Sequence, residues 1–320
     1  MMETAIRNFA SQFAWKPDMQ NKKAFKPRKK FVVCGMGGSH LPADILRAWR
    51  PELDLVDWRN YGLPPIGDLK DRLVILSSYS GNTEEVIEAF EKCRKQKLSM
   101  AAITIGGRLL ELARKHGAPY LQMPNTGIQP RSATGLAVRG HLALTRDTRG
   151  LLVSGRLAKT LKPEAYQRQG RSLAERLTGR VPVIYASAEN EILARNWKIK
   201  MNETAKIPAF FNVVPEMNHN EMTGFDVVTA TRSLAKNFHF LMLEDDKDHP
   251  RNRMRMRVLR RLFEERALPV DTVRIEGRDP FERIFSSSII GDWSALYLAG
   301  YYGTESEEVP MVEEFKKLIA

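Results

Sequence analysis

The chain has 320 residues, of which 43% are hydrophobic and 28% charged, as in ordinary globular proteins. Its length predicts two domains, because a single hydrophobic core rarely grows past about 250–300 residues. No apolar run approaches the roughly 18–20 residues that cross a bilayer, and the N-terminus lacks the apolar core of a signal peptide. Cys34 and Cys93 are too few for a disulfide framework. We therefore expect a cytoplasmic protein without a membrane partner.

The net charge of +12 raises the possibility of a nucleic-acid partner. Basic residues cluster at 22–30 and 251–261, and the second run carries apolar residues at helical spacing among its arginines. That spacing is typical of an amphipathic surface helix, so we expect no nucleic acid. A positive field also suits a small anionic substrate, because it raises the local concentration of phosphates.

In the first half, short apolar strands alternate with helical patterns. Strands are predicted at 31–35, 73–78, 100–107 and 120–123, and helices at 41–50, 82–96 and 108–117. The pattern loosens at 147–165, which indicates a connection between two halves. In the second half, strands are predicted at 181–187, 238–244 and 270–277, and helices at 189–206, 251–267, 281–303 and near Pro310.

This alternation predicts the α/β class, with parallel, doubly wound sheets covered by helices on both faces. The two halves have a similar build without an alignable repeat. We therefore predict one domain over residues 1–150 and a second over residues 151–320.

The first predicted strand ends in a glycine-rich turn, Gly35-Met36-Gly37-Gly38-Ser39-His40. A dinucleotide fingerprint would need glycine at position 40, and no acidic residue is clearly placed for a ribose, so we do not expect NAD. A glycine turn that enters a helix exposes backbone N–H groups and the positive end of the helix dipole. It therefore suits a phosphate.

A second turn, SSYSGNT at 77–83, occupies the same position one predicted strand later. Ligands of open α/β sheets bind outside the carboxyl ends of strands, so the two turns together predict one anion pocket. The structural alternative is that Ser80 and Thr83 cap the following helix and that Gly81 relieves the turn. No Walker A lysine follows, which excludes a nucleoside triphosphate cradle of that type.

The motifs GMGGS and SSYSGNTEE resemble the sugar isomerase (SIS) domain, in which hydroxyl side chains hold a sugar phosphate. The segments NWKIKMNETAKIPAFF and VPEMNHNEMTGF resemble the bifunctional phosphoglucose/phosphomannose isomerases, which have two SIS-like domains in about 300 residues. The resemblance runs from about residue 30 to the C-terminus. It implies an isomerase that interconverts glucose 6-phosphate and fructose 6-phosphate, and mannose 6-phosphate as a further substrate, without metal or cofactor.

The resemblance also assigns residues to roles. Those that match the family's phosphate-binding residues are Gly37, Gly38, Ser39, Ser78, Ser80 and Thr83. Glu203 matches the base that moves a proton between C2 and C1, and Arg131 matches the arginine that faces the enediolate. His219 matches a histidine that assists ring opening from the other subunit, which implies a homodimer.

Each assignment has a plainer alternative in the residues themselves. Glu203 could be one exposed acid on an amphipathic helix, and Arg131 an ordinary surface arginine. His219 lies in a polar loop, where a histidine is usually a surface residue. The same surface interpretation is expected for the other histidines, and no pair has metal-ligand spacing; these are His40, His116, His141, His239 and His249.

Two C-terminal positions are less firmly matched. Lys316 matches a lysine that helps in ring opening, although Lys317 is its neighbour. Val309 falls where the family commonly has a threonine associated with room for both C2 epimers, a departure that counts against the phosphomannose activity. Other SIS functions stay open: a non-catalytic sugar-phosphate-binding regulator, and an aminotransferring or epimerising enzyme.

Overall fold

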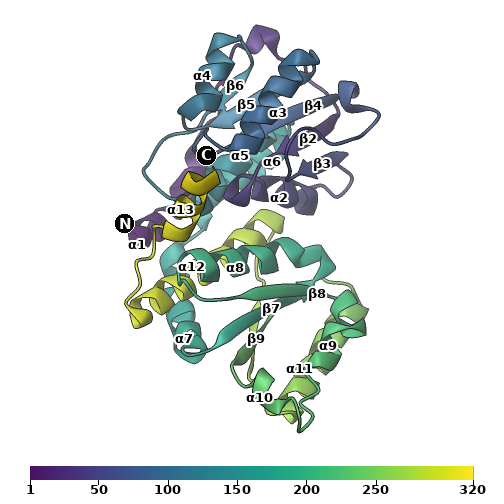
Figure 1. Cartoon of the computed structure of the whole chain (residues 1–320), viewed down its shortest axis with the longest axis vertical. Helices are drawn as coiled ribbons and strands as arrows, with labels where there is room; N and C mark the ends of the chain where they lie inside the picture. Colours follow the sequence, from purple (N-terminus) through teal and green to yellow (C-terminus); the bar gives the residue numbers. More distant parts are fainter. Residues whose placement is uncertain (320) are drawn as a thin grey trace. The chain divides into compact units, whose positions relative to one another are not determined.

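The structure is a computed structural model, and it describes residues 1–319. The chain forms two compact units (Figure 1). The N-terminal unit comprises residues 8–161, and the C-terminal unit comprises the chain from residue 162 onward together with residues 1–7. Among residues 1–319, no helix combines the length and apolar character needed to span a membrane.

The division lies later than the sequence indicated. Residues 147–165 were expected to be a connection, but helix α6 (Thr148–Thr160) occupies most of this range. Division after residue 150 would cut α6, and the chain passes between units after Leu161. Helix α1 (Met2–Arg7) belongs to the C-terminal unit, where the guanidinium of Arg7 lies 5.3 Å from the ring centre of Trp293.

The N-terminal unit contains a six-stranded sheet in the order β1-β6-β5-β4-β2-β3. The strands are β1 (Met19–Gln20), β2 (Lys30–Cys34), β3 (Leu55–Trp58), β4 (Arg72–Ser77), β5 (Ser99–Thr104) and β6 (Tyr120–Gln122). Strand β1 pairs antiparallel with β6, and all other pairs are parallel. Every residue of the central strand β4 is buried, as expected for a strand covered on both faces.

Helices cover both faces of this sheet. Alternate residues such as Val32 and Val74 pack into one core with α3 (Glu84–Lys95) and α4 (Gly107–Lys115). The opposite face carries α2 (Leu41–Trp49) and α5 (Thr134–Leu144), which pack against each other. Gly140 of α5 lies against the side chain of Ile103 in β5, where a Cβ atom would meet it at 2.0 Å.

The C-terminal unit contains a four-stranded parallel sheet in the order β10-β9-β7-β8. The strands are β7 (Val181–Ser187), β8 (Phe210–Val214), β9 (Phe238–Glu244) and β10 (Val270–Arg274). One face packs on α11 (Pro250–Glu265) through Phe240 and Phe263, whose rings are 4.3 Å apart. The predicted α/β class with parallel sheets is thus confirmed in both units.

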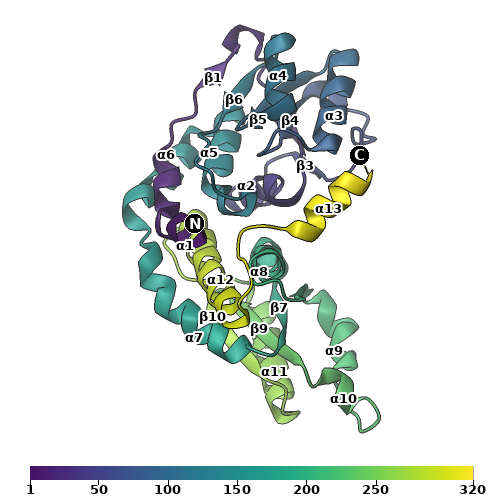
Figure 2. The same cartoon turned by 60° about the vertical axis from the view of Figure 1, so that its left-hand side comes forward.

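Three long helices complete the C-terminal unit: α7 (Gln167–Leu177), α8 (Glu191–Glu203) and α12 (Pro280–Tyr302). Helices α7 and α12 run alongside each other, and Gly170 permits their close approach, since a Cβ there would lie 2.4 Å from Trp293 (Figure 2). Helix α13 (Pro310–Ile319) begins at the predicted proline. The basic run at 251–261 forms part of the predicted amphipathic helix, with Met256 and Leu259 buried.

The surface interpretation of the histidines was wrong at three positions. His40, His141 and His239 are at most 5% exposed. His141 is fully buried in α5, with Nδ1 2.7 Å from the carbonyl of Ala137, and burial lowers its pKa to about 4. The imidazole is therefore neutral in the folded chain near pH 7.

His141 makes stability depend on acidity. Between pH 6.5 and 4 the unfolded chain binds a proton at this position that the folded chain excludes, so stability falls as pH falls. We expect this group to remove about 2 kcal/mol of unfolding free energy between pH 7 and pH 5. Urea unfolding at pH 7 and pH 5 should show a smaller loss of unfolding free energy for His141→Leu than for the wild type. The exposed His116→Gln variant is the control, and parallel profiles for all three proteins would contradict the expectation.

Candidate active site

The glycine turn follows β2 and enters α2 as a single 3₁₀ turn, η3 (Gly37–Ser39). Gly37 has a positive φ of 52°, a conformation that favours glycine, and a Cβ there would meet nothing within 4 Å. A Cβ on Gly38 would instead lie 3.1 Å from the carbonyl of Pro130. The turn therefore has open space on one side and a neighbouring backbone on the other.

The second turn, residues 77–83, begins at the last residue of β4 and is called the hydroxyl turn below. It is hydrogen-bonded directly to the glycine turn. The Oγ of Ser39 accepts a hydrogen bond from the backbone N–H of Tyr79 at 2.9 Å. The Oγ of Ser77 donates to the backbone carbonyl of Ser39 at 2.8 Å. Both hydrogen bonds are buried, so the two turns are held as one unit at the carboxyl ends of adjacent strands.

The hydroxyl groups of this turn face one another. The Oγ atom of Ser78 lies 2.8 Å from Oγ1 of Thr83 and also accepts from the N–H of Gly81 at 3.0 Å. Thr83 precedes α3, but its side chain makes no capping hydrogen bond to the helix. Ser80 is exposed and accepts from the N–H of Asn82 at 3.2 Å. The side chain of Thr83 therefore does not cap α3.

Gly81 has the structural role expected of it. Its φ is +77°, and a Cβ at this position would lie 1.8 Å from the carbonyl oxygen of Gly106. Only glycine allows this approach without movement of the backbone. Gly81 thus brings the loop after β5 against the hydroxyl turn.

Arg131 lies beside the glycine turn, in the short 3₁₀ turn η5 (Pro130–Ser132). The backbone nitrogen of Arg131 would be 3.3 Å from a Cβ on Gly38, and the residue is 3% exposed. The carbonyl of Ser132 accepts a hydrogen bond from Nε2 of Gln12 at 2.7 Å, which anchors η5. The plain surface interpretation of Arg131 is therefore wrong, and the structure places this residue beside the glycine turn.

A charged network that the sequence did not indicate begins one residue after the glycine turn. The Nδ1 atom of His40 lies 3.6 Å from carboxylate oxygens of both Asp44 and Asp57. Burial opposes a charge on His40, but the two carboxylates outweigh it and raise the pKa of the imidazole. The possible ligand atoms of these three side chains lie within 4.8 Å of one another, close enough to hold a metal ion. However, Arg47 and Arg59 already pair with the carboxylates, so we interpret the group as an ion-pair network beneath the turn.

Glu203 is the last residue of α8, which ends three residues earlier than the predicted helix, and it is half-buried. Lys200, one turn earlier, forms a buried ion pair with Asp292 of α12, and both side chains are at most 5% exposed. This pair holds the end of α8 against α12. Asn202 donates to the carbonyl of Ile207 at 2.9 Å, which orders the loop that follows. The carboxylate of Glu203 therefore extends from a rigid helix end.

His219 and Glu203 lie at opposite ends of the C-terminal sheet. Helix α8 runs back along the sheet after β7, so Glu203 precedes the amino end of β8, whereas His219 follows its carboxyl end. A strand of five residues, as β8 is, spans roughly 16 Å. His219 is exposed at the end of the 3₁₀ turn η8 (Glu216–His219). The C-terminal unit of a single chain therefore does not bring Glu203 and His219 together.

Lys316 is exposed on α13 and forms an ion pair of 2.6 Å with Glu313. No side chain of α13 is buried among residues 310–319. Val309 stands at the start of this helix, and its carbonyl accepts from the N–H groups of Val312 and Glu313. The structure distinguishes Lys316 from Lys317 only through this ion pair.

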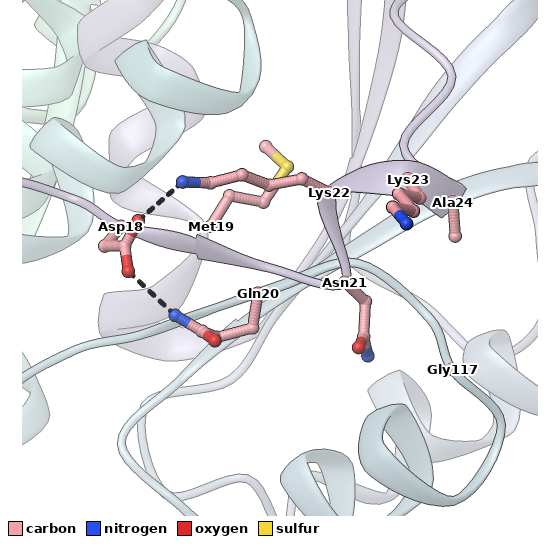
Figure 3. Close-up of a pocket in the computed structure, with 8 residues that line it drawn as sticks. All are labelled: Asp18, Met19, Gln20, Asn21, Lys22, Lys23, Ala24 and Gly117. Atoms are coloured by element: carbon pink, nitrogen blue, oxygen red, sulfur yellow. Dashed lines mark hydrogen bonds and ion pairs between the residues drawn. The ribbon is translucent and has the colours of Figure 1, made fainter.

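A hollow of about 490 Å³ lies elsewhere in the N-terminal unit, beside the edge strand β1 and the loop at Gly117 (Figure 3). Asp18 in its wall pairs with Lys22 at 2.8 Å and accepts from Gln20 at 2.8 Å, and Lys23 lines the hollow as well. Gly117 precedes β6, so the hollow lies at the amino end of that strand, away from the two turns. None of the residues matched to the isomerase roles lines it.

Comparison with known proteins decides the family. A bifunctional phosphoglucose/phosphomannose isomerase of Aquifex aeolicus is 30% identical, covering 98% of this chain and 96% of its own length. A protein of the same name from Caldicellulosiruptor bescii is 34% identical over 91% of this chain and 89% of its own length. This chain belongs to the phosphoglucose/phosphomannose isomerase family.

A family model and a solved structure agree with this family assignment. The model of the bacterial phospho-glucose isomerase C-terminal SIS domain matches residues 166–319, nearly the whole C-terminal unit. Among solved structures, the C-terminal domain of a Francisella tularensis glucosamine-fructose-6-phosphate aminotransferase has a TM-score of 0.71. It covers 96% of this chain and 98% of its own, at 13% identity, and it therefore supports the fold alone. The predicted SIS-type isomerase family is confirmed.

The two glycines with positive φ provide a matched pair of variants. Gly37→Ala should cost about 1–2 kcal/mol of unfolding free energy, because only backbone strain is added. Gly81→Ala should cost about 3 kcal/mol or more, because its Cβ also collides with Gly106. Urea unfolding measures both, and the Michaelis constant of Gly37→Ala should rise, since its methyl group enters the open side of the turn. Equal stability losses would contradict this packing.

Proposed function

We propose that this chain interconverts glucose 6-phosphate and fructose 6-phosphate, and also converts mannose 6-phosphate, as the names of its relatives indicate. One observation carries the proposal beyond family membership: the Ser39–Tyr79 hydrogen bond joins the glycine and hydroxyl turns at the carboxyl ends of adjacent strands. That is where open α/β sheets bind ligands, and small donors converge there.

The N-terminal unit holds the unreactive end of the substrate in this proposal. The phosphate accepts hydrogen bonds from the backbone N–H groups of Gly37 and Gly38 and from the hydroxyl group of Ser39. The hydroxyl turn supplies Ser78, Ser80 and Thr83. The Ser78–Thr83 contact of 2.8 Å supports this, because it places two hydroxyl groups together without using that of Thr83 as a helix cap.

The C-terminal unit supplies the proton transfer. Glu203 takes a proton from C2 of the open-chain sugar and returns it to C1, while Arg131 stabilises the negative charge that develops on the enediolate oxygens. His219 and Lys316 assist ring opening. A base fixed on the end of α8 by the buried Lys200–Asp292 pair needs little reorganisation during the reaction. We expect neither a metal nor a cofactor in these steps.

We further propose that the enzyme is a homodimer in which His219 acts on the partner's substrate. The exposure of His219 and its position at the opposite end of the sheet from Glu203 support this arrangement. We place the enzyme in the cytoplasm, because both cysteines are free and buried, as suits a reducing compartment.

Replacement of the proposed base tests the reaction. Glu203→Gln keeps the size of the side chain and removes its basicity, so kcat should fall by roughly 10²–10⁴-fold with little change in sugar-phosphate binding. The assay couples turnover of fructose 6-phosphate and of mannose 6-phosphate in the presence of a chelator. Glu191→Gln, at the other end of α8, is the control. Binding without turnover by the unaltered chain would instead indicate a sugar-phosphate sensor.

Mixing two inactive variants tests the shared site. A dimer of one Glu203→Gln chain and one His219→Ala chain contains one site with both groups intact if the histidine crosses the interface. Random reassociation should then restore about a quarter of the wild-type activity. A histidine that acts within its own chain predicts no recovery. Light scattering on each sample reports the oligomeric state independently.

A further inference from the structure

A groove lies at the carboxyl ends of β9 and β10 in the C-terminal unit. It consists of two cavities of about 350 and 180 Å³, which share Glu244 and Arg274 as lining residues. The groove is at the other end of the sheet from Glu203, because the strands are parallel and α8 ends at their amino side. None of the residues assigned to the isomerase reaction lines it.

Glu244 and Arg274 are the last residues of their strands and lie directly opposite each other in the ladder. Opposite charges at neighbouring positions of adjacent strands attract each other. Here the structure gives Arg274 no carboxylate partner among residues 1–319, and Oε1 of Glu244 is buried without a hydrogen bond. The guanidinium of Arg274 and the carboxylate of Glu244 are thus neighbours in the groove but form no ion pair with each other.

Asp248 provides a second buried acceptor. It is 6% exposed and lines the smaller cavity. Its Oδ1 accepts from Ser187 at 2.6 Å and from Asn190 at 2.8 Å, while Oδ2 has no hydrogen-bond partner. A buried carboxylate oxygen without a donor costs free energy, so a ligand that donates hydrogen bonds would stabilise the groove.

Helix α11 adds a cationic side chain to the same groove. Arg257 lines the smaller cavity, and the structure gives it, like Arg274, no carboxylate within ion-pair distance in the described part of the chain. Both residues are exposed. Guanidinium groups bind phosphate oxygens through paired hydrogen bonds, so this face of the basic run suits a phosphate. The isomerase reaction does not use this run.

We propose that the groove binds a small phosphorylated polyol, with its phosphate on Arg257 and Arg274 and its hydroxyl groups donating to Glu244 and Asp248. Inorganic phosphate would leave the buried carboxylate oxygens without donors. An uncharged polyol would leave the two guanidinium groups without an anion. The groove therefore selects a molecule that carries both groups.

Isothermal titration of the full-length chain with glucitol 6-phosphate, which cannot isomerise, tests the proposal. The wild type should bind two molecules per chain, one in the groove and one at the turns. Arg257→Ala/Arg274→Ala should bind one and keep kcat/KM for fructose 6-phosphate within about twofold. Ser80→Ala/Thr83→Ala should lose the other binding event. The two variants separate a failure of the groove from a failure of the proposed active site.

The control is Arg251→Ala/Arg261→Ala, which removes the same charge from exposed positions of α11 and should still bind two molecules. One molecule per chain in the wild type, or equal loss in the control, would overturn the groove as a site. In the Ser80→Ala/Thr83→Ala background, inorganic phosphate should bind at least about tenfold more weakly than glucitol 6-phosphate. Equal affinities would overturn the role of Glu244 and Asp248.

Discussion

The hydrogen bonds of Ser39 to the chain after β4 are the constraint on which the N-terminal unit depends. Two adjacent parallel strands bring two loops to one edge of the sheet, but strand pairing alone does not set the loops relative to each other. Ser39 joins them through both its hydroxyl and its carbonyl group. Because these bonds are buried, losing one leaves a polar group without a partner, which costs about 1–3 kcal/mol. The two turns are thus held together by the fold itself.

Close backbone approaches extend this constraint to neighbouring loops. Gly38 admits the turn that carries Arg131, and Gly81 admits the loop at Gly106. Each glycine is needed because another backbone occupies the space where a side chain would start. Four loops therefore converge at the carboxyl ends of β2, β4 and β5, and small hydroxyl side chains suit the little space that remains.

The C-terminal unit repeats the parallel topology with different chemistry at its edges. Its sheet has no glycine-rich hydroxyl turn at the carboxyl ends. Instead, Glu244 and Arg274 end adjacent strands there, while the carboxylate of Glu203 extends from a helix end at the amino side. The buried Lys200–Asp292 pair holds that helix, and such a pair favours one geometry over others because a misplaced partner leaves a buried charge. The same architecture therefore carries different side chains at the ends of its strands in the two units.

The sequence by itself determined the fold class, the long buried strands and the position of the glycine and hydroxyl turns, because apolar runs, glycine and hydroxyl residues act locally. It missed β3 and β8, in which most residues are only partly buried, and α5, whose residues are nearly all buried and show no amphipathic period. Only the family resemblance singled out Glu203 and His219 as candidates, since a single acid or histidine has no local signature. Only the tertiary structure decided that Arg131 and His141 are buried, that Lys200 pairs with Asp292, and that Glu203 and His219 lie at opposite ends of one sheet. Those facts depend on contacts between residues far apart in the chain, which no local pattern encodes.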